Sequence, residues 1–152
     1  MYVYRIVKSE RRTEDLSGMG AFRAGGRWND KGTYVLYTSE NSSLALLENL
    51  VHFDVEDIPE DLYIMEIKVH NEELIFQIPD LDYPKDWLNT DNLACKKLGD
   101  KLLSDHKLLG IKVRSVVNQS EYNFLLDPLF SGYHDSIKIT NVIKVPFDRR
   151  LT

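Results

Sequence analysis

Strand-like segments outnumber helix-like segments in this sequence, and this ratio restricts the fold more than any other feature. β-Branched and aromatic residues, often alternating with polar ones, are typical of strands, whereas apolar residues three or four positions apart are typical of helices. Strand-like runs occupy residues 3–7, 33–38, 61–69, 73–78, 111–117, 122–128 and 137–145, and helical spacing occurs at 44–53 and 91–107. A regular strand–helix–strand series would need a helix after nearly every strand. The sequence therefore predicts an α+β fold with a mixed or antiparallel β-sheet core and few helices.

Length and composition indicate a single compact domain that covers residues 1–152. One hydrophobic core usually serves about 100 to 200 residues, and the chain has 152 residues without an internal repeat or a low-complexity segment. No apolar run approaches the roughly 20 residues that span a bilayer. The N-terminal stretch "MYVYRIVKSE" lacks the apolar core of a signal peptide. We therefore expect a cytoplasmic protein that does not bind membranes.

The charge of the chain argues against direct binding of nucleic acid. The net charge is −5 and the pI is near 5.4, whereas contacts to a phosphate backbone need clustered lysine and arginine. Basic residues do gather near the N-terminus, at Arg11, Arg12, Arg23 and Arg27, and a few of them would suffice for a small anionic ligand. The four histidines are scattered and Cys95 is the single cysteine. The sequence therefore predicts neither a metal site nor an internal disulfide.

Residues 9–32 form the first candidate for a functional segment. They are polar and glycine-rich and have no sustained periodicity, and such a loop is longer than compact domains usually carry without a function. After the strand that follows, "SENSS" offers Asn41, Ser42 or Ser43 as the N-cap of the first long helix. Gly110 is expected to follow the end of the second.

Three polar residues around the first long helix could form a site. On a helical wheel, Glu48 falls beside an apolar stripe, and a carboxylate next to a core must be paired, hydrogen-bonded or exposed to a cleft. The stripe consists of Leu44, Leu47 and Val51. Tyr37 ends the strand before this helix, and Arg27 lies on the loop before that strand. Two interpretations follow: a structural Arg27–Glu48 ion pair with Tyr37 packed over it, or a ligand site made by the same residues.

Common nucleotide-binding and hydrolase motifs are absent. In "GMGAFRAGGRW", Arg23 stands where G-x-G-x-x-G needs its third glycine, and the stretch precedes a strand instead of following one. Lys31, Gly32 and Thr33 do not have the order of a phosphate loop. Ser115 follows an apolar run without the G-x-S-x-G pattern of a nucleophile. We therefore interpret Ser115 as a hydrogen-bonding residue.

Taken in order, these features resemble the RES domain family, the toxin half of RES–Xre toxin–antitoxin pairs, which is named for a conserved arginine, glutamate and serine. The resemblance rests most strongly on "GGRWNDKGTYVLYTSENSSLALLENLVH", a glycine-arginine-tryptophan-asparagine loop followed by a tyrosine strand and an A-x-x-E helix. Shorter matches are "VYRI" before it and "VRSVV", "YNFLLDP" and "VPFDRRL" after it. Residues 70–108 carry little of the resemblance.

The resemblance implies a fold similar to ADP-ribosyltransferases and an activity that consumes NAD+ as a substrate, with no cofactor or metal. It implies that Glu48, Arg27 and Tyr37 are the catalytic residues. Glu48 would stabilise positive charge on the ribose, Tyr37 would stack on the nicotinamide, and Arg27 would hold the ribose or the pyrophosphate. The NAD+-binding residues that it implies are Arg27, Tyr37, Ser115, Arg5 and Asn123. Trp28 is expected to anchor the loop by packing.

The reaction and the partner are likewise expectations from the resemblance. The nicotinamide–ribose bond of NAD+ would be cleaved by hydrolysis or phosphorolysis, and the partner would be an Xre-type helix-turn-helix antitoxin. The alternatives are a protein ADP-ribosyltransferase and a catalytically silent module that binds such a partner, and formation of a homo-oligomer stays open. Two positions depart from the family pattern: Arg114 stands where proline is usual, and Asp127 stands where asparagine is usual.

Overall fold

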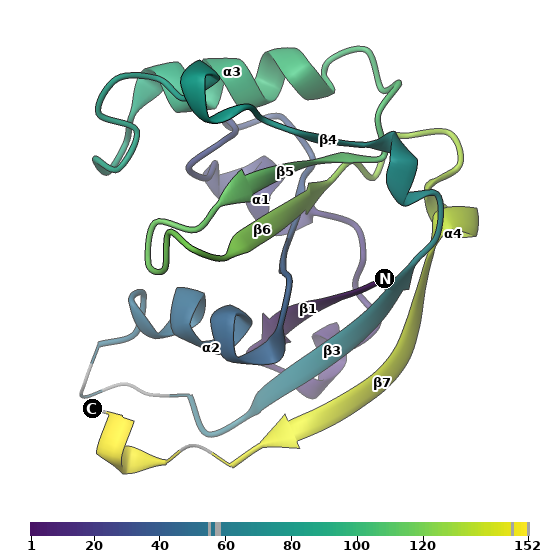
Figure 1. Ribbon diagram of the computed structural model, residues 1–152. Coiled ribbons are helices and arrows are strands. Elements are labelled where there is room, and N and C mark those ends of the chain that lie inside the picture. The colour runs from purple at the N-terminus through teal and green to yellow at the C-terminus, as the bar shows by residue number, and fades with distance from the viewer. Residues whose placement is uncertain (55, 57–58, 147, 152) are drawn as a thin grey trace.

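The described residues form one mixed sheet with short helices around it, so the predicted α+β class is confirmed. The computed structural model describes residues 1–54, 56, 59–146 and 148–151. Its seven-stranded sheet has the order β4-β5-β6-β2-β1-β3-β7 (Figure 1). The strands are β1 (Tyr2–Val7), β2 (Leu36–Ser39), β3 (Leu62–Val69), β4 (Ile75–Gln77), β5 (Gly110–Arg114), β6 (Tyr122–Leu126) and β7 (Ile137–Val145). Neighbouring strands are antiparallel except β4 and β5, which are parallel.

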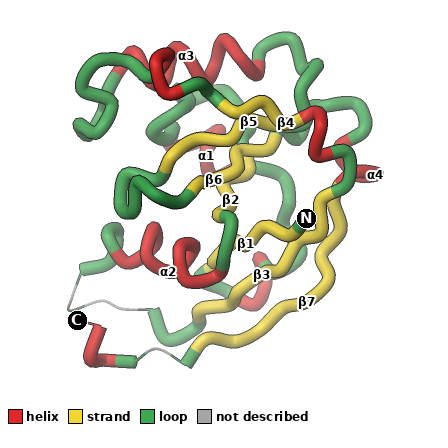
Figure 2. The backbone as a smooth tube through the Cα atoms, in the orientation of Figure 1, coloured by secondary structure: helices red, strands yellow, loops and turns green. Residues whose placement is uncertain are grey.

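The helices are short. They are α1 (Met19–Ala24), α2 (Ser42–Leu50), α3 (Leu93–Leu103) and α4 (Tyr133–Ser136), with 3₁₀ turns at Glu10–Arg12, Glu72–Leu74, Asp80–Asp82 and Arg149–Leu151. In Figure 2, α2 and α3 lie well apart, α2 beside β1 and α3 beside the β4–β5 end of the sheet. None of the helices that the described residues form is long and apolar enough to cross a bilayer.

The sheet opens in its middle, between β1 and β2. These strands share only the pair Tyr4↔Ser39, whereas β1 pairs with β3 from Tyr2 to Val7 and β2 pairs with β6 along its whole length. The two halves of the sheet, β4-β5-β6-β2 and β1-β3-β7, therefore diverge beyond one residue pair (Figure 2). Such an opening leaves backbone groups of β1 and β2 for other partners.

Each half of the sheet has its own helix on the same face. α2 packs on β1 and β3 through Ala45 against Ile6 and Leu62. A separate cluster of buried hydrophobic residues joins α3 to β5 and to the loop before β2. It contains Trp28, Val35, Ile78, Cys95, Leu103, Ile111, Val113 and Leu125. Because directly paired residues share a face and alternate residues return to it, Tyr37 and Ser39 of β2 lie on the same face as Tyr4 of β1. The bottom of a depression between α2 and α3 would thus be formed by β2.

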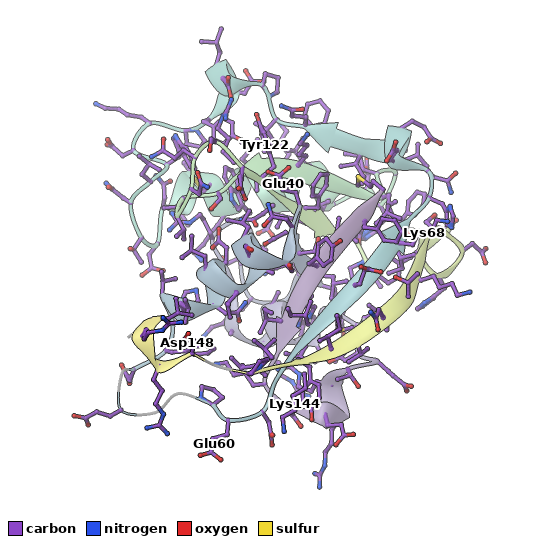
Figure 3. All side chains as sticks on the ribbon, turned by 60° about the horizontal axis from the view of Figure 1, so that its bottom comes forward. Glu40, Glu60, Lys68, Tyr122, Lys144 and Asp148 are labelled. Atoms are coloured by element: carbon purple, nitrogen blue, oxygen red, sulfur yellow. The ribbon has the colours of Figure 1, made fainter. Side chains whose placement is uncertain are left out.

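The ends of β2 and β6 are tied together beside this opening. Tyr122 N donates to Glu40 Oε1 at 2.9 Å, and Glu40 N donates to Tyr122 O at 3.1 Å. Figure 3 shows Glu40 and Tyr122 side by side. The next pair along the ladder is Ser39↔Asn123. The two hydrogen bonds between Glu40 and Tyr122 therefore keep Ser39 and Asn123 in place at the edge of the opening.

Several predictions of local structure were wrong. Residues 9–32 contain the turn Glu10–Arg12 and α1, which are too short for periodicity to reveal. Gly110 does not lie at the end of the second long helix, because α3 already ends at Leu103. Gly110 is instead the first residue of β5. A Cβ at Gly110 would lie 2.4 Å from Leu125 O, so the close approach of β6 requires the glycine. The predicted N-cap, in contrast, is confirmed: of the three candidates it is Asn41, whose side chain accepts from Leu44 N.

Candidate functional site

A cavity of about 850 Å³ lies in the opening between the two halves of the sheet. It is bounded by β1, α1, the loop before β2, α2 and the start of the turn after β5. Of the residues implicated by sequence, Arg5, Arg27, Tyr37, Glu48 and Asn123 line it. Ser115 is fully buried behind that lining. The structure thus brings together residues that are up to 118 positions apart in the sequence, counting from Arg5 to Asn123.

Glu48 is held by two side chains from the opposite half of the sheet. Its Oε1 accepts from Ser115 Oγ at 2.6 Å and from Asn123 Nδ2 at 2.7 Å. Among the described residues Glu48 forms no ion pair with Arg27, so the interpretation as a structural Arg27–Glu48 pair was wrong. The predicted stripe was also wrong in part, because Leu47 and Val51 are exposed.

The Ser115 hydroxyl has no capacity left for nucleophilic attack in this arrangement. Its oxygen accepts from Val117 N at 3.1 Å and from Asn118 N at 3.0 Å. Its one proton is donated to Glu48. A hydroxyl has one donor and two acceptor positions, so all three are used. Ser115 therefore orients the carboxylate.

Asn123 is oriented in turn by Ser39, a residue that the sequence did not single out. Ser39 Oγ donates to Asn123 Oδ1 at 2.7 Å. Because this contact occupies the carbonyl end of the amide, Asn123 presents its NH₂ group to Glu48. Ser39 is buried, and its pairing with Asn123 across β2 and β6 could not be found without the register of those strands.

Tyr37 is fixed at its hydroxyl and contributes its ring to the cavity. The hydroxyl donates to Asn29 Oδ1 at 2.6 Å and accepts from Trp28 N at 3.1 Å. Burial raises the pKa of Tyr37 far above its ordinary value of 10.0, so the phenol stays protonated. A Cβ at Gly26 would lie 2.6 Å from the Tyr37 hydroxyl, which explains the second glycine of "GGRW".

Asn29 organises the loop before β2 and was not identified from the sequence. It is completely buried, and its Nδ2 donates to the carbonyls of Ala21, Asp30 and Thr33. With Tyr37 as the donor to its Oδ1, the amide joins α1, the loop and β2. The asparagine of "GGRWN" was the available signal. A buried amide at a tight loop commonly replaces missing backbone partners.

Trp28 anchors the loop by packing, as expected. Trp28 is 2% exposed, and the centroids of its ring and the Tyr83 ring lie 5.8 Å apart with the two rings nearly perpendicular. α3 approaches the Trp28 backbone so closely that a Cβ at Gly99 would lie 1.8 Å from Trp28 O. The glycine inside α3 is thus required by this contact.

Arg27 holds the wall opposite α2. Its Nη1 donates to Trp87 O at 3.0 Å and to Asn89 O at 2.9 Å. No hydrogen bond from a described residue engages its Nε or Nη2. The guanidinium therefore fastens the segment before α3 with one nitrogen, and its other donors are left available.

Arg5 bridges the two diverging strands. Its Nη1 donates to Tyr37 O at 3.2 Å, and its Nε is buried without a hydrogen-bond partner among the described residues. Burial and then the nearby charge of Arg12 lower the pKa of Arg5. A buried donor without a partner is unfavourable, so an acceptor on a bound ligand would relieve it.

The cavity is basic although the protein is acidic. The basic residues in its lining are Arg5, Lys8, Arg12, Arg27, Lys96 and Arg114, and the acidic ones are Glu48 and Asp91. An excess of cationic groups in a concave site favours an anionic ligand. The described residues contain no group of three or more histidine, cysteine or acidic residues that could hold a metal ion.

The two departures from the family pattern have different surroundings. Arg114 lines the cavity and forms a two-pronged pair with Asp80, at 2.8 Å from Nε and 3.1 Å from Nη2. Asp127 is buried away from the cavity lining, where His106 Nδ1 lies 2.7 Å from its Oδ2 and Leu129 N donates to its Oδ1. The aspartate therefore does not touch the residues around Glu48.

Comparisons with known proteins agree with this fold. The family model described as RES domain matches residues 2–148. Toxin Res of Yersinia enterocolitica is 30% identical over 152 residues, which cover 99% of each chain. The Prs ADP-ribosylating toxin of Sphingobium sp. strain YBL2 is 30% identical over 154 residues, covering 97% of this chain and 94% of the toxin. A chain in the crystal structure of the Mycobacterium tuberculosis MbcT–MbcA toxin–antitoxin complex superposes with a TM-score of 0.71 at 17% identity, covering 99% of this chain and 85% of that one.

Proposed function

Since the chain belongs to the RES domain family, we propose that it is the toxin of a toxin–antitoxin pair and that it cleaves the nicotinamide–ribose bond of NAD+. The observation that carries the proposal is Glu48, whose Oε1 is held by Ser115 and Asn123 at the wall of a basic cavity. NAD+ joins a cationic ring to an anionic pyrophosphate. A carboxylate within a cationic cavity suits both parts.

Glu48 stabilises the charge that develops during cleavage. When the bond between the ribose carbon and the nicotinamide nitrogen breaks, its electron pair goes to the nicotinamide, which leaves neutral, and positive charge builds on the ribose. With Oε1 engaged by two donors, Oε2 is left for the ribose, since no described residue donates a hydrogen bond to it. A fixed carboxylate aimed at the developing charge lowers the barrier without reorganising.

Tyr37 and the arginines bind the remainder of the substrate. The Tyr37 ring offers an aromatic face to the nicotinamide ring while its hydroxyl is held by Asn29 and Trp28. The free nitrogens of Arg27 and the unpartnered Nε of Arg5 donate to the pyrophosphate or ribose oxygens. These are the roles that the resemblance implied, and the contacts support them.

Water or inorganic phosphate completes the reaction by adding through an oxygen to the ribose carbon after nicotinamide leaves, and water releases one proton to the solvent as it adds. A target-protein side chain is the second candidate acceptor, because a relative that is 30% identical is named an ADP-ribosylating toxin. The proposed partner is an Xre-type antitoxin. A chain of similar fold occurs in a toxin–antitoxin complex, which supports a partner of that general kind.

The test is to incubate the purified protein with NAD+ labelled in the adenylate part, with and without phosphate and lysate, and to follow free nicotinamide and label on protein. We expect nicotinamide release that Glu48→Gln abolishes. Label on protein would select the transferase, and a phosphorylated ribose product would select phosphorolysis. No release under any condition would leave the binding module. An unchanged rate in both Glu48→Ala and Arg27→Ala would refute the site.

A further inference from the structure

The segment between the turn Asp80–Asp82 and α3 forms one wall of the cavity and carries an apolar side chain without a packing role. Leu88 lines the cavity and is 42% exposed. It belongs to none of the three hydrophobic clusters that the described residues form, whereas Trp87 beside it packs in the cluster around Trp28. An exposed leucine at the wall of a ligand cavity is available to a ligand.

The backbone around Leu88 is held on both sides by Arg27. Arg27 Nη1 donates to the carbonyls of Trp87 and Asn89, the residues immediately before and after Leu88. A guanidinium group from the opposite loop thus fixes the backbone that carries the Leu88 side chain.

The ends of the same segment are also fixed. Asn92 Nδ2 donates to the carbonyls of Lys85 and Asp86, and Asn89 N donates to Asp86 O at 2.9 Å. Asp86 and Asp91 adopt the left-handed backbone conformation, with φ of 59° and 56°. These contacts involve the backbone and Asn92, so the segment keeps its shape without help from the Leu88 side chain.

We propose that Leu88 is a substrate-binding residue that packs on a flat heteroaromatic ring of the dinucleotide, held in place by Arg27. The inference rests on the proposed function and adds a contact that residues 70–108, where the family resemblance is weak, supply in this chain. The apolar face of a purine or pyridinium ring would cover the exposed leucine and remove both from water. Arg27 then acts twice, on the wall through Nη1 and on the anionic part of the substrate through its other nitrogens.

The test compares Leu88→Ala with Leu81→Ala. Leu81 belongs to the same stretch between β4 and α3, is 97% exposed and does not line the cavity, so it is a matched control. We expect Leu88→Ala to raise the KM for NAD+ by about tenfold with kcat nearly unchanged, because a side chain that contributes equally to substrate and transition-state binding acts on KM. Leu81→Ala should behave as the native protein, and both variants should keep the native melting temperature.

Calorimetric titration with ADP-ribose identifies the ring. If Leu88→Ala weakens ADP-ribose binding as much as it raises KM, the ring is adenine; if ADP-ribose binding is unchanged while KM rises, the ring is nicotinamide. Equal kinetics for Leu88→Ala and Leu81→Ala in an active protein would overturn the inference. Loss of kcat at constant KM would overturn it too. If the native protein releases no nicotinamide, the proposed function is rejected separately. Titration of NAD+ into the native and Leu88→Ala proteins then still tests the inference, because equal affinities would overturn it.

Discussion

Ser115 Oγ lies 2.6 Å from Glu48 Oε1 and donates its only hydroxyl proton to that carboxylate. Ser115 comes from the turn between β5 and β6, in one half of the sheet, and Glu48 comes from α2, which packs on the other half. Two backbone amides of the turn, from Val117 and Asn118, donate to the same hydroxyl oxygen. Ser115 therefore fixes the Glu48 carboxylate relative to the turn after β5.

Replacing Ser115 by alanine should lower kcat and stability together. Glu48 would lose one of its two orienting donors, and two amides would lose their acceptor at a buried site. We expect a loss of about 1–3 kcal/mol in the free energy of unfolding and a fall in kcat of about tenfold or more, measured by urea denaturation and by nicotinamide release. Ser120→Ala, in the exposed part of the same turn, is the control. A Ser115→Ala variant with native kcat would contradict the orienting role.

Tyr37→Phe should separate the ring from the hydroxyl. The variant loses the hydrogen bonds to Asn29 and from Trp28, so we expect a loss of about 1–2 kcal/mol in the free energy of unfolding. The ring remains, so the KM for NAD+ should change less than about threefold, whereas Tyr37→Ala should raise it strongly. If phenylalanine and alanine raised KM equally, the ring would not be the binding group.

The buried tyrosines should make stability fall at alkaline pH. Burial raises the pKa of Tyr37 and of Tyr133 above their ordinary value of 10.0, so the folded protein retains protons that the unfolded chain releases. Their contribution is complete below about pH 10 and is lost as pH rises above it. Urea denaturation from pH 8 to 11 should show this decline, and Tyr37→Phe should make it shallower. Identical slopes for both proteins would argue against a contribution from Tyr37.

Gly99→Ala should destabilise the protein although alanine favours helices. The added Cβ would lie 1.8 Å from Trp28 O, so either α3 or the loop must move, at a cost of at least about 2 kcal/mol. Gly20, inside α1, offers a matched control because the nearest atom to a Cβ there is Arg12 Nη2 at 3.8 Å. Gly20→Ala should be neutral or slightly stabilising in thermal denaturation. A Gly99→Ala protein that melts with the native one would show that this contact can relax freely.

Much of the fold could be predicted because strands and long helices leave periodic patterns. The alternation at residues 3–7 and 61–69 indicated β1 and β3, and Asn41 was among the three cap candidates that residue type offered. The short helix α1 was missed because six residues are fewer than two turns. Gly110 was misplaced because a glycine required by a close strand looks the same in sequence as one that ends a helix.

The candidate site could be predicted only as a set of residue types. The local order of Arg27, Tyr37 and Glu48 indicated that they would lie near one another, since they belong to consecutive elements. Their actual partners could not be predicted in the same way. Arg27 binds carbonyls about 60 residues later, and Glu48 binds Ser115 and Asn123.

The sequence by itself determined the class of fold, most strands, the two longer helices and the main residues to suspect, because these patterns depend on neighbours along the chain. Only the tertiary structure decided which of these residues orient Glu48, which hold the wall of the cavity and where Leu88 is exposed. Those outcomes depend on the order of the strands, on the single residue pair between β1 and β2, and on contacts across the opening that this pair leaves. Patterns of neighbouring residues do not show which distant segments pair, since that pairing is decided by the packing of the whole core.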